Sequence, residues 1–93
     1  MNEFNGPRAP RTRVRVAVTL KHPEVGEQRS HTRDISGDGA FILGEGILMP
    51  AVGEIVEVQV QDLPGEPAPV VRMRVTRIDK DGMGLQFIDL DPS

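Results

Sequence analysis

Hydrophobic residues in much of this chain recur at every second position, which is the period of a β-strand with one buried face. The pattern is clearest from Arg13 to Leu20, where Val14, Val16 and Val18 alternate with polar or small residues. The predicted strands span residues 13–20, 28–35, 40–43, 56–60, 71–78 and 83–87. No stretch of ten or more residues has the 3.6-residue period of an amphipathic helix, so we expect an all-β fold.

Turns and loops separate these strands. Residues typical of turns gather at 22–26, 36–39, 50–53 and 81–82. The segment 63–69 contains three prolines, which cannot donate ladder hydrogen bonds, and is predicted to be a loop. Ile78 breaks the alternation of its strand and predicts a β-bulge near the strand end. Six short strands joined by turns favour a small antiparallel β-barrel, because a closed barrel leaves no open sheet edge.

The length of 93 residues suits one small domain. Residues 1–10 contain two prolines and a glycine without any hydrophobic period, so we expect a flexible N-terminal arm before a barrel domain at 11–90. No stretch approaches the roughly 20 apolar residues of a membrane span, and the N-terminus does not resemble a signal peptide. We therefore expect a cytoplasmic protein without membrane insertion.

Several classes of chemistry lack the residues or motifs that they need. The chain has no cysteine and only two histidines, His22 and His31, so we expect no disulfide, thiolate chemistry or metal site. Neither glycine-rich fingerprint for nucleotide phosphates is complete. Ser36, His31 and Asp34 lie within six residues of one another, and nothing suggests an oxyanion hole beside them. The sequence predicts no enzymatic activity and no cofactor.

The net charge of −3 is unevenly distributed along the chain. Residues 8–33 contain seven basic and two acidic side chains, whereas residues 34–71 contain seven acidic side chains and no lysine or arginine. The first block therefore carries +5 and the second −7. This asymmetry fits either two faces that attract each other or an anion site built from the first block.

Arg11 and Arg15 are candidate ligand contacts because they are four residues apart. In an extended chain such positions share a face and lie about 13 Å apart. If Arg11 lies where the arm bends into the strand, both guanidinium groups can converge on a phosphate or on guanine O6 and N7. The same spacing also fits a solvated strand face, on which arginine keeps the strand soluble.

Residues 34–39, with the sequence DISGDG, form a second candidate segment. The Asp34 carboxylate can accept hydrogen bonds from N1–H and N2–H of guanine, and Ser36 points the same way in an extended chain. Gly39 allows the backbone to approach a ligand closely. The alternative is an ordinary turn, in which the aspartate and the serine cap the backbone and Gly39 adopts a positive φ.

Together the two segments resemble the PilZ domain, the bacterial receptor module for cyclic di-GMP. Its RxxxR motif is matched by residues 11–15 (RTRVR), and its (D/N)xSxxG motif is matched by residues 34–39 (DISGDG). The 18 residues between the motifs suit a hairpin, and residues 82–88 are similar to the last barrel strand of the family. The resemblance covers residues 8–90.

The resemblance implies a six-stranded antiparallel PilZ-like β-barrel whose N-terminal arginine segment folds over cyclic di-GMP. The implied ligand contacts are Arg11 and Arg15 to phosphate and guanine faces, Asp34 and Ser36 to guanine edges, and Gly39 in the turn. Arg8 and Arg13 match no motif position and are expected as secondary contacts. The helix that commonly follows the barrel in the family is expected to be short or absent here. Pro10 precedes the first motif at a position that in the family affects whether one ligand or a stacked pair binds.

The sequence therefore predicts a non-enzymatic cyclic di-GMP receptor that changes its surface toward an unidentified protein partner. The alternative is a PilZ-like adaptor barrel that binds a protein partner without nucleotide, and the intact motif residues favour the receptor. DNA or RNA binding is not expected, because residues 34–71 are acidic and the chain has only three aromatic residues for stacking. The downstream partner, the regulated process and the oligomeric state stay open.

Overall fold

Residues 10–61, 65 and 68–88 are described by the computed structural model, and every regular element among them is a β-strand. The strands are β1 (Arg11–Arg13), β2 (Ala17–His22), β3 (Gly26–Ser36), β4 (Gly39–Leu43), β5 (Ile55–Val60), β6 (Val71–Asp79) and β7 (Gly82–Phe87). Among the described residues there is accordingly no helix that could cross a membrane.

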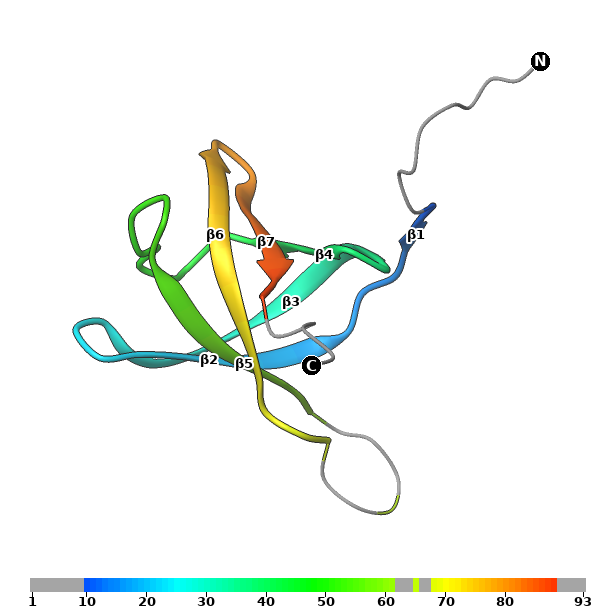
Figure 1. Ribbon diagram of the computed structural model, residues 1–93, viewed down its shortest axis with the longest axis horizontal. Coiled ribbons are helices and arrows are strands. Elements are labelled where there is room, and N and C mark those ends of the chain that lie inside the picture. Colours follow the sequence, from blue (N-terminus) through cyan, green and yellow to red (C-terminus); the bar gives the residue numbers. More distant parts are fainter. Residues whose placement is uncertain (1–9, 62–64, 66–67, 89–93) are drawn as a thin grey trace.

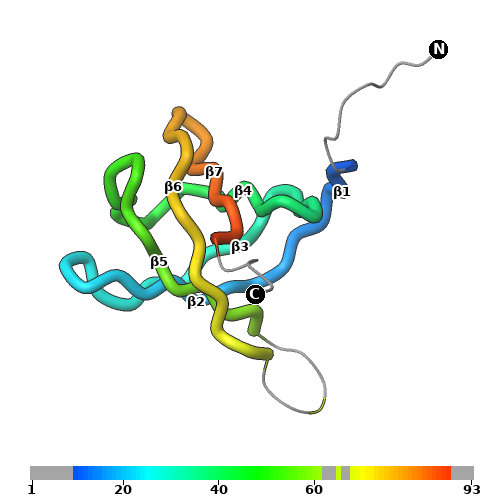
Figure 2. Tube along the Cα trace, in the orientation of Figure 1, coloured from blue at the N-terminus to red at the C-terminus, as the bar shows by residue number. Residues whose placement is uncertain are grey.

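The strands from β2 to β7 form a closed barrel. The hydrogen-bonded order is β1-β3-β2-β5-β6-β7-β4, every pairing is antiparallel, and a further pairing of β3 with β4 closes the ring. β1 lies outside this ring and pairs with the C-terminal end of β3. Figures 1 and 2 show the strands wrapped around a single interior. The six-stranded antiparallel barrel expected from the sequence is confirmed.

The barrel interior is filled by the hydrophobic residues that alternate along the strands. The buried cluster consists of Val18, Leu20, Ala40, Ile42, Val56, Val58, Met73, Val75, Met83 and Leu85. Complete burial of a valine, leucine, isoleucine or methionine side chain contributes roughly 1.5–3 kcal/mol, so this cluster stabilises the fold although the chain is short.

The expected continuous strand over residues 13–20 is wrong, because residues 14–16 lie between β1 and β2. The cause is Thr32 of β3, whose side chain is almost completely buried. Its hydroxyl accepts a hydrogen bond from the Val16 N–H at 3.0 Å and donates one to the Val14 carbonyl at 2.5 Å. The hydroxyl thus satisfies backbone groups that a regular ladder would pair. Two backbone hydrogen bonds, from Val14 N–H to the Arg33 carbonyl and from Thr32 N–H to the Val16 carbonyl, still hold this segment against β3.

Buried polar side chains also explain why the pattern over residues 28–35 is weak. Ser30, like Thr32, is buried, and its hydroxyl donates a hydrogen bond of 2.6 Å to the Leu43 carbonyl. Asp34 and Ser36, further along β3, are buried as well. The strand forms despite this polar composition because its buried polar groups have hydrogen-bond partners.

Two β-bulges decide which side chains of β3 and β6 face outward. In β3 the register relative to β4 shifts immediately before Asp34, so Arg33 is the extra residue. In β6 the register relative to β7 shifts between Val75 and Arg77. The second shift confirms the bulge expected from Ile78. Both bulges lie beside the candidate ligand site.

The flexible N-terminal arm expected from the sequence falls mostly on residues that the structure does not describe. Residues 1–9 and 89–93 lie outside the described residues. The division into an arm at 1–10 and a barrel domain at 11–90 therefore stays a prediction.

Candidate ligand site

Asp34 is the centre of a cluster of charged side chains on the outside of the barrel. Its side chain is only 7% exposed, and each carboxylate oxygen accepts one hydrogen bond from a guanidinium group. Arg11 Nε donates to Oδ1 at 2.7 Å, and Arg33 Nε donates to Oδ2 at 2.8 Å. The buried carboxylate is thus paired on both sides, as a charge removed from water must be.

The register of β1 against β3 brings the two sequence motifs together. Arg11 pairs with Ser36 and Arg13 pairs with Asp34, so side chains from both motifs meet on one face. The Arg11 Nη1 group also reaches the Ser36 hydroxyl at 3.4 Å. The short strand β1 therefore has a clear role in positioning the first motif arginine over the second motif.

The ionisation of Asp34 follows from these contacts. Burial raises the pKa of its carboxyl, but the hydrogen bonds and the positive charges of Arg33 and Arg11 outweigh burial. The net result is a pKa below the ordinary value of 3.8. At neutral pH the Asp34 side chain is consequently an ionised group that only accepts hydrogen bonds.

The turn after β3 combines a capping serine with a glycine that touches the next strand. Ser36 Oγ accepts a hydrogen bond from the Asp38 N–H at 3.1 Å, so this serine does cap the turn. Gly39 does not have the positive φ considered from the sequence. A Cβ atom at Gly39 would instead overlap the Leu85 carbonyl oxygen of β7. Close packing of β4 on β7 is therefore what requires glycine at this position.

Phe41 is buried although it is absent from the interior cluster. Its neighbours Ala40 and Ile42 point into the barrel, whereas the Phe41 ring lies on the outer face and is only 1% exposed. Two guanidinium groups lie against the ring, that of Arg33 at 3.9 Å and that of Arg77 at 5.2 Å from its centroid. Both distances lie within the range of a cation–π interaction.

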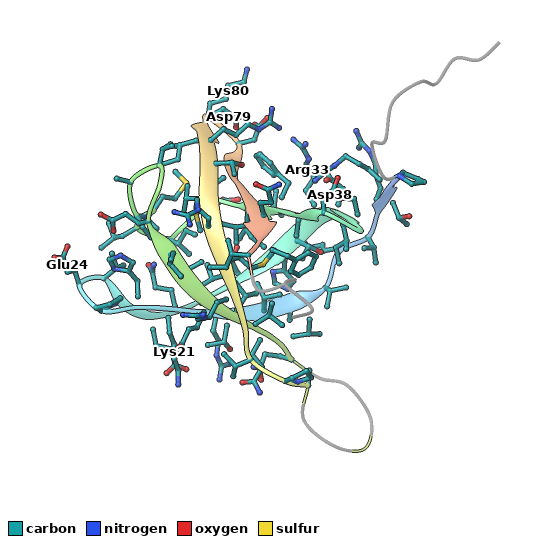
Figure 3. The ribbon with its side chains drawn as sticks, in the orientation of Figure 1. Lys21, Glu24, Arg33, Asp38, Asp79 and Lys80 are labelled. Atoms are coloured by element: carbon teal, nitrogen blue, oxygen red, sulfur yellow. The ribbon has the colours of Figure 1, made fainter. Side chains whose placement is uncertain are left out.

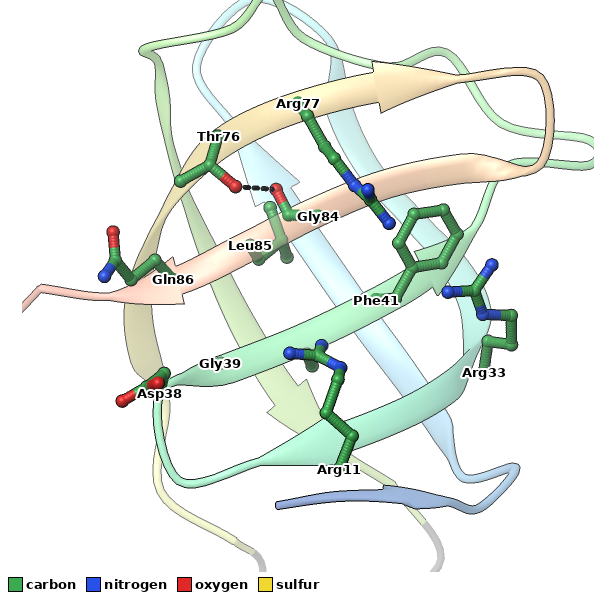
Figure 4. Close-up of a pocket in the computed structure, with 11 residues that line it drawn as sticks. Arg11, Arg33, Asp38, Gly39, Phe41, Thr76, Arg77, Gly84, Leu85 and Gln86 are labelled. Carbon is green, nitrogen blue, oxygen red and sulfur yellow. Dashed lines mark hydrogen bonds between the residues drawn. The ribbon is translucent and has the colours of Figure 1, made fainter. Parts of the chain in front are cut away.

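Arg11, Arg33 and Phe41, but not Asp34 or Ser36, line a cavity of about 440 Å³ on the outer face of the barrel. Figure 4 shows its floor, formed by β4 and β7, with Arg11 on one side and Arg77 reaching in from β6. Asp38 and Gly39 also line it. The cavity therefore combines three guanidinium groups with a carboxylate at its rim, which suits a ligand that carries negative charge and hydrogen-bonding edges.

Arg15 and Arg13 are not brought into this cavity. Both line a neighbouring cavity together with Arg33, which borders the two cavities. Within the described part of the chain, neither Arg13 nor Arg15 makes a hydrogen bond or an ion pair through its side chain. Arg8 lies outside the described residues. The two motif arginines thus approach the site from adjacent cavities and do not converge in this structure.

The candidate site lies on one side of the barrel. Figure 3 shows Arg33 and Asp38 beside β3 and β4, on the far side of the barrel from Glu24 in the β2–β3 turn. The described residues include no group of three or more side chains that could hold a metal ion. The side chains of the candidate site can therefore bind a ligand through hydrogen bonds and through charge.

Regular alternation of inward and outward side chains along the strands does not predict that Arg33, Phe41 and Arg77 contribute to the cavity. Strict alternation places Arg33 on the face opposite Asp34, and it places Arg77 on the inward face together with Val75. The two bulges reverse these assignments. The one available signal was the broken alternation at Ile78, since a bulge before that residue turns the preceding arginine outward.

Comparison with known proteins agrees with the fold. A family model described as PilZ domain matches residues 7–93 of the chain. Among solved structures, the chain is similar to the Bacillus subtilis inhibitor of motility, MotI/DgrA, with a TM-score of 0.72. The two chains share 18% sequence identity, and the match covers 96% of this chain and 45% of that one. This chain thus spans less than half of the solved protein, with which it shares the fold.

Proposed function

The chain belongs to the PilZ domain family, and we propose that it is a non-enzymatic receptor that binds cyclic di-GMP on the outer face of the barrel. The observation that carries the proposal is the buried, ionised carboxylate of Asp34 between two guanidinium groups. Guanine presents N1–H and N2–H as two adjacent donors, and a carboxylate is the acceptor that matches both of them. Adenine lacks this pair of donors.

In the free protein, the guanidinium groups of Arg11 and Arg33 occupy the acceptor positions that a guanine would use. Each oxygen of Asp34 has further lone pairs, and the Arg11 side chain is 49% exposed, so it can leave for the ligand at modest cost. A guanidinium group released in this way can bind a phosphate through two parallel hydrogen bonds. Ligand binding would therefore exchange one set of charge-assisted hydrogen bonds for another.

The remaining motif residues support this arrangement. Ser36 lies next to Arg11 on the same face and can add a hydrogen bond to a guanine edge. Gly39 lines the cavity and presents backbone to a ligand. The side chains of Arg13 and Arg15 have no hydrogen-bond or ion-pair partner among the described residues, so we assign them, with Arg8, to the ligand phosphates.

The signal passed on by the receptor would be a rearrangement of the surface around β1. Among the described residues, β1 has three residues, all exposed, and pairs only with β3. A ligand that withdraws Arg11 from Asp34 would move this strand more easily than any strand of the closed ring. The moved surface would then be recognised by a protein partner.

The test is the base preference of an Asp34→Ala variant. Wild-type protein is titrated with cyclic di-GMP and cyclic di-AMP by calorimetry, and we expect clear preference for the guanine ligand. Asp34→Ala should lose that preference, whereas Glu24→Ala, which removes an exposed carboxylate on the far side of the barrel, should keep it. Unaltered preference in Asp34→Ala would move the guanine site elsewhere.

A protein-binding adaptor barrel without nucleotide is the second candidate. It is favoured by Leu48 and Val52 in the β4–β5 connection, which are 69% and 57% exposed, since large apolar side chains at a surface suit a protein partner. This candidate predicts that wild-type protein gives no heat with cyclic di-GMP. The same calorimetric titration therefore decides between the two functions.

A further inference from the structure

The bulge in β6 gives Arg77 an orientation that the strand pattern alone would not give it. Along β6, Val71, Met73 and Val75 face the interior, and regular alternation would place Arg77 on that side too. Because the register shifts between Val75 and Arg77, Arg77 pairs with Gly84 and faces outward. The bulge thus places the positive charge of Arg77 in the cavity that Arg11 and Gly39 also line.

Gly84 leaves room for the side chain of Arg77 to cross β7. A Cβ atom at this position would lie 3.2 Å from Arg77 Cγ, so a larger residue would crowd the arginine side chain where it crosses the strand. On β4, the residue paired with Gly84 is Phe41, whose ring receives the guanidinium group. Figure 4 shows Arg77 extending over β7 toward this ring. The side chain is therefore held across the cavity floor by its surroundings.

Arg77 differs from the other two cavity arginines in having no carboxylate partner. Arg11 and Arg33 both donate to Asp34. Among the described residues, Arg77 makes no ion pair or hydrogen bond through its side chain, and its guanidinium contact is the face of Phe41. A ring face leaves the N–H groups at the edge of the guanidinium plane free to donate.

We propose that Arg77 is a further ligand-binding residue, whose guanidinium group contacts a phosphate of the bound cyclic dinucleotide. The inference rests on the proposed function and adds a contact that neither sequence motif contains. In the proposed complex Asp34 accepts hydrogen bonds from the uncharged guanine edge. Arg77 is positioned by Gly84 and Phe41, and no carboxylate among the described residues pairs with its charge. A phosphate is the ligand group that matches a free, planar set of N–H donors.

The experiment compares three variants of the full chain by calorimetric titration with cyclic di-GMP. Arg77→Met keeps a long side chain over Phe41 without the charge, and we expect its affinity to fall about ten- to a hundred-fold. Arg77→Lys keeps the charge without the planar fork and should lose less. Arg74→Met is the matched control, since Arg74 lies on the same strand, donates to the Gly53 carbonyl at 3.2 Å and does not line the cavity.

A salt series separates a phosphate contact from a packing role. Binding by wild-type protein and by Arg74→Met should weaken as salt is added, and binding by Arg77→Met should weaken less steeply because one charge contact is gone. Thermal unfolding checks that each variant is folded. Equal affinity of Arg77→Met and wild type overturns the inference, and so does a loss of affinity with an unchanged salt dependence. If wild type itself does not bind, the proposed function fails, and this outcome is distinct from the failure of Arg77 alone.

Discussion

Replacing Asp34 by asparagine should destabilise the protein even in the absence of ligand. Asparagine has nearly the same shape, but one of its terminal groups is an amide NH₂ that donates hydrogen bonds. In wild type both terminal oxygens accept N–H donors, from Arg11 at 2.7 Å and from Arg33 at 2.8 Å. The variant therefore sets a donor against a donor on one side and removes a negative charge between two positive ones.

The expected loss can be estimated from these contacts. A hydrogen bond to a charged group contributes about 1.5–3 kcal/mol, and one such bond is lost outright. The side chains of Arg11 and Arg33 are 49% and 34% exposed, so water can replace part of the lost interaction. We expect the free energy of unfolding to fall by roughly 1–2 kcal/mol at pH 7.

The assay is urea unfolding of wild type, Asp34→Asn and the control Asp38→Asn at several pH values. Asp38 is exposed and its carboxylate makes no ion pair among the described residues, so its replacement should change stability by less than about 0.5 kcal/mol. The folded-state pKa of Asp34 lies below the ordinary 3.8, so the stability from its ionised form is complete well above that pH. This contribution should disappear as the pH falls from about 3.8 through the lower folded-state pKa.

Two results would refute this reasoning. Equal stability of Asp34→Asn and wild type at pH 7 would mean that the paired guanidinium groups do not stabilise the fold. A stability difference that stays constant when the pH is lowered below 3.8 would mean that the charge of Asp34 is not its source.

Two further substitutions test how the site is held in place. Thr32→Val keeps the shape of a buried side chain but removes its two hydrogen bonds to the backbone of residues 14–16. We expect the free energy of unfolding, measured with urea, to fall by about 1–3 kcal/mol, and the Val16 amide to exchange its hydrogen faster. Stability equal to wild type would show that water replaces the hydroxyl. Gly39→Ala forces a methyl group onto the Leu85 carbonyl and should lower the free energy of unfolding by at least about 2 kcal/mol. Loss of the β4–β7 pairing should be visible as faster hydrogen exchange in these strands. An unchanged exchange pattern would contradict the close packing.

The fold was predictable because alternation, turns and length all indicate one architecture. Apart from β3, whose buried side chains are polar, the barrel strands carry hydrophobic residues at every second position, as β5 does with Val56 and Val58. The interruption at residues 14–16 was not predictable, because it depends on the buried hydroxyl of Thr32, a residue sixteen positions further along the chain than Val16. Local patterns carry no information about such a long-range contact.

The candidate site was predictable only in part. Arg11, Asp34 and Ser36 belong to sequence motifs, and the pairing of β1 with β3 brings them together. Arg33 and Arg77 join them only because a bulge in each strand changes the direction of the side chains. A bulge depends on the register of two strands, and register is set by the whole barrel.

The central claim is that cyclic di-GMP binds on the outer face formed by β1, the end of β3, β4 and β7. Titration followed by ¹H–¹⁵N NMR spectra of the labelled chain tests it most directly. We expect the largest shifts at the amides of Arg11, residues 34–39 and residues 84–86, with small changes in the β2–β3 turn and in the connection at 44–54. Shifts centred on that connection, or unchanged spectra at saturating cyclic di-GMP, would contradict the claim.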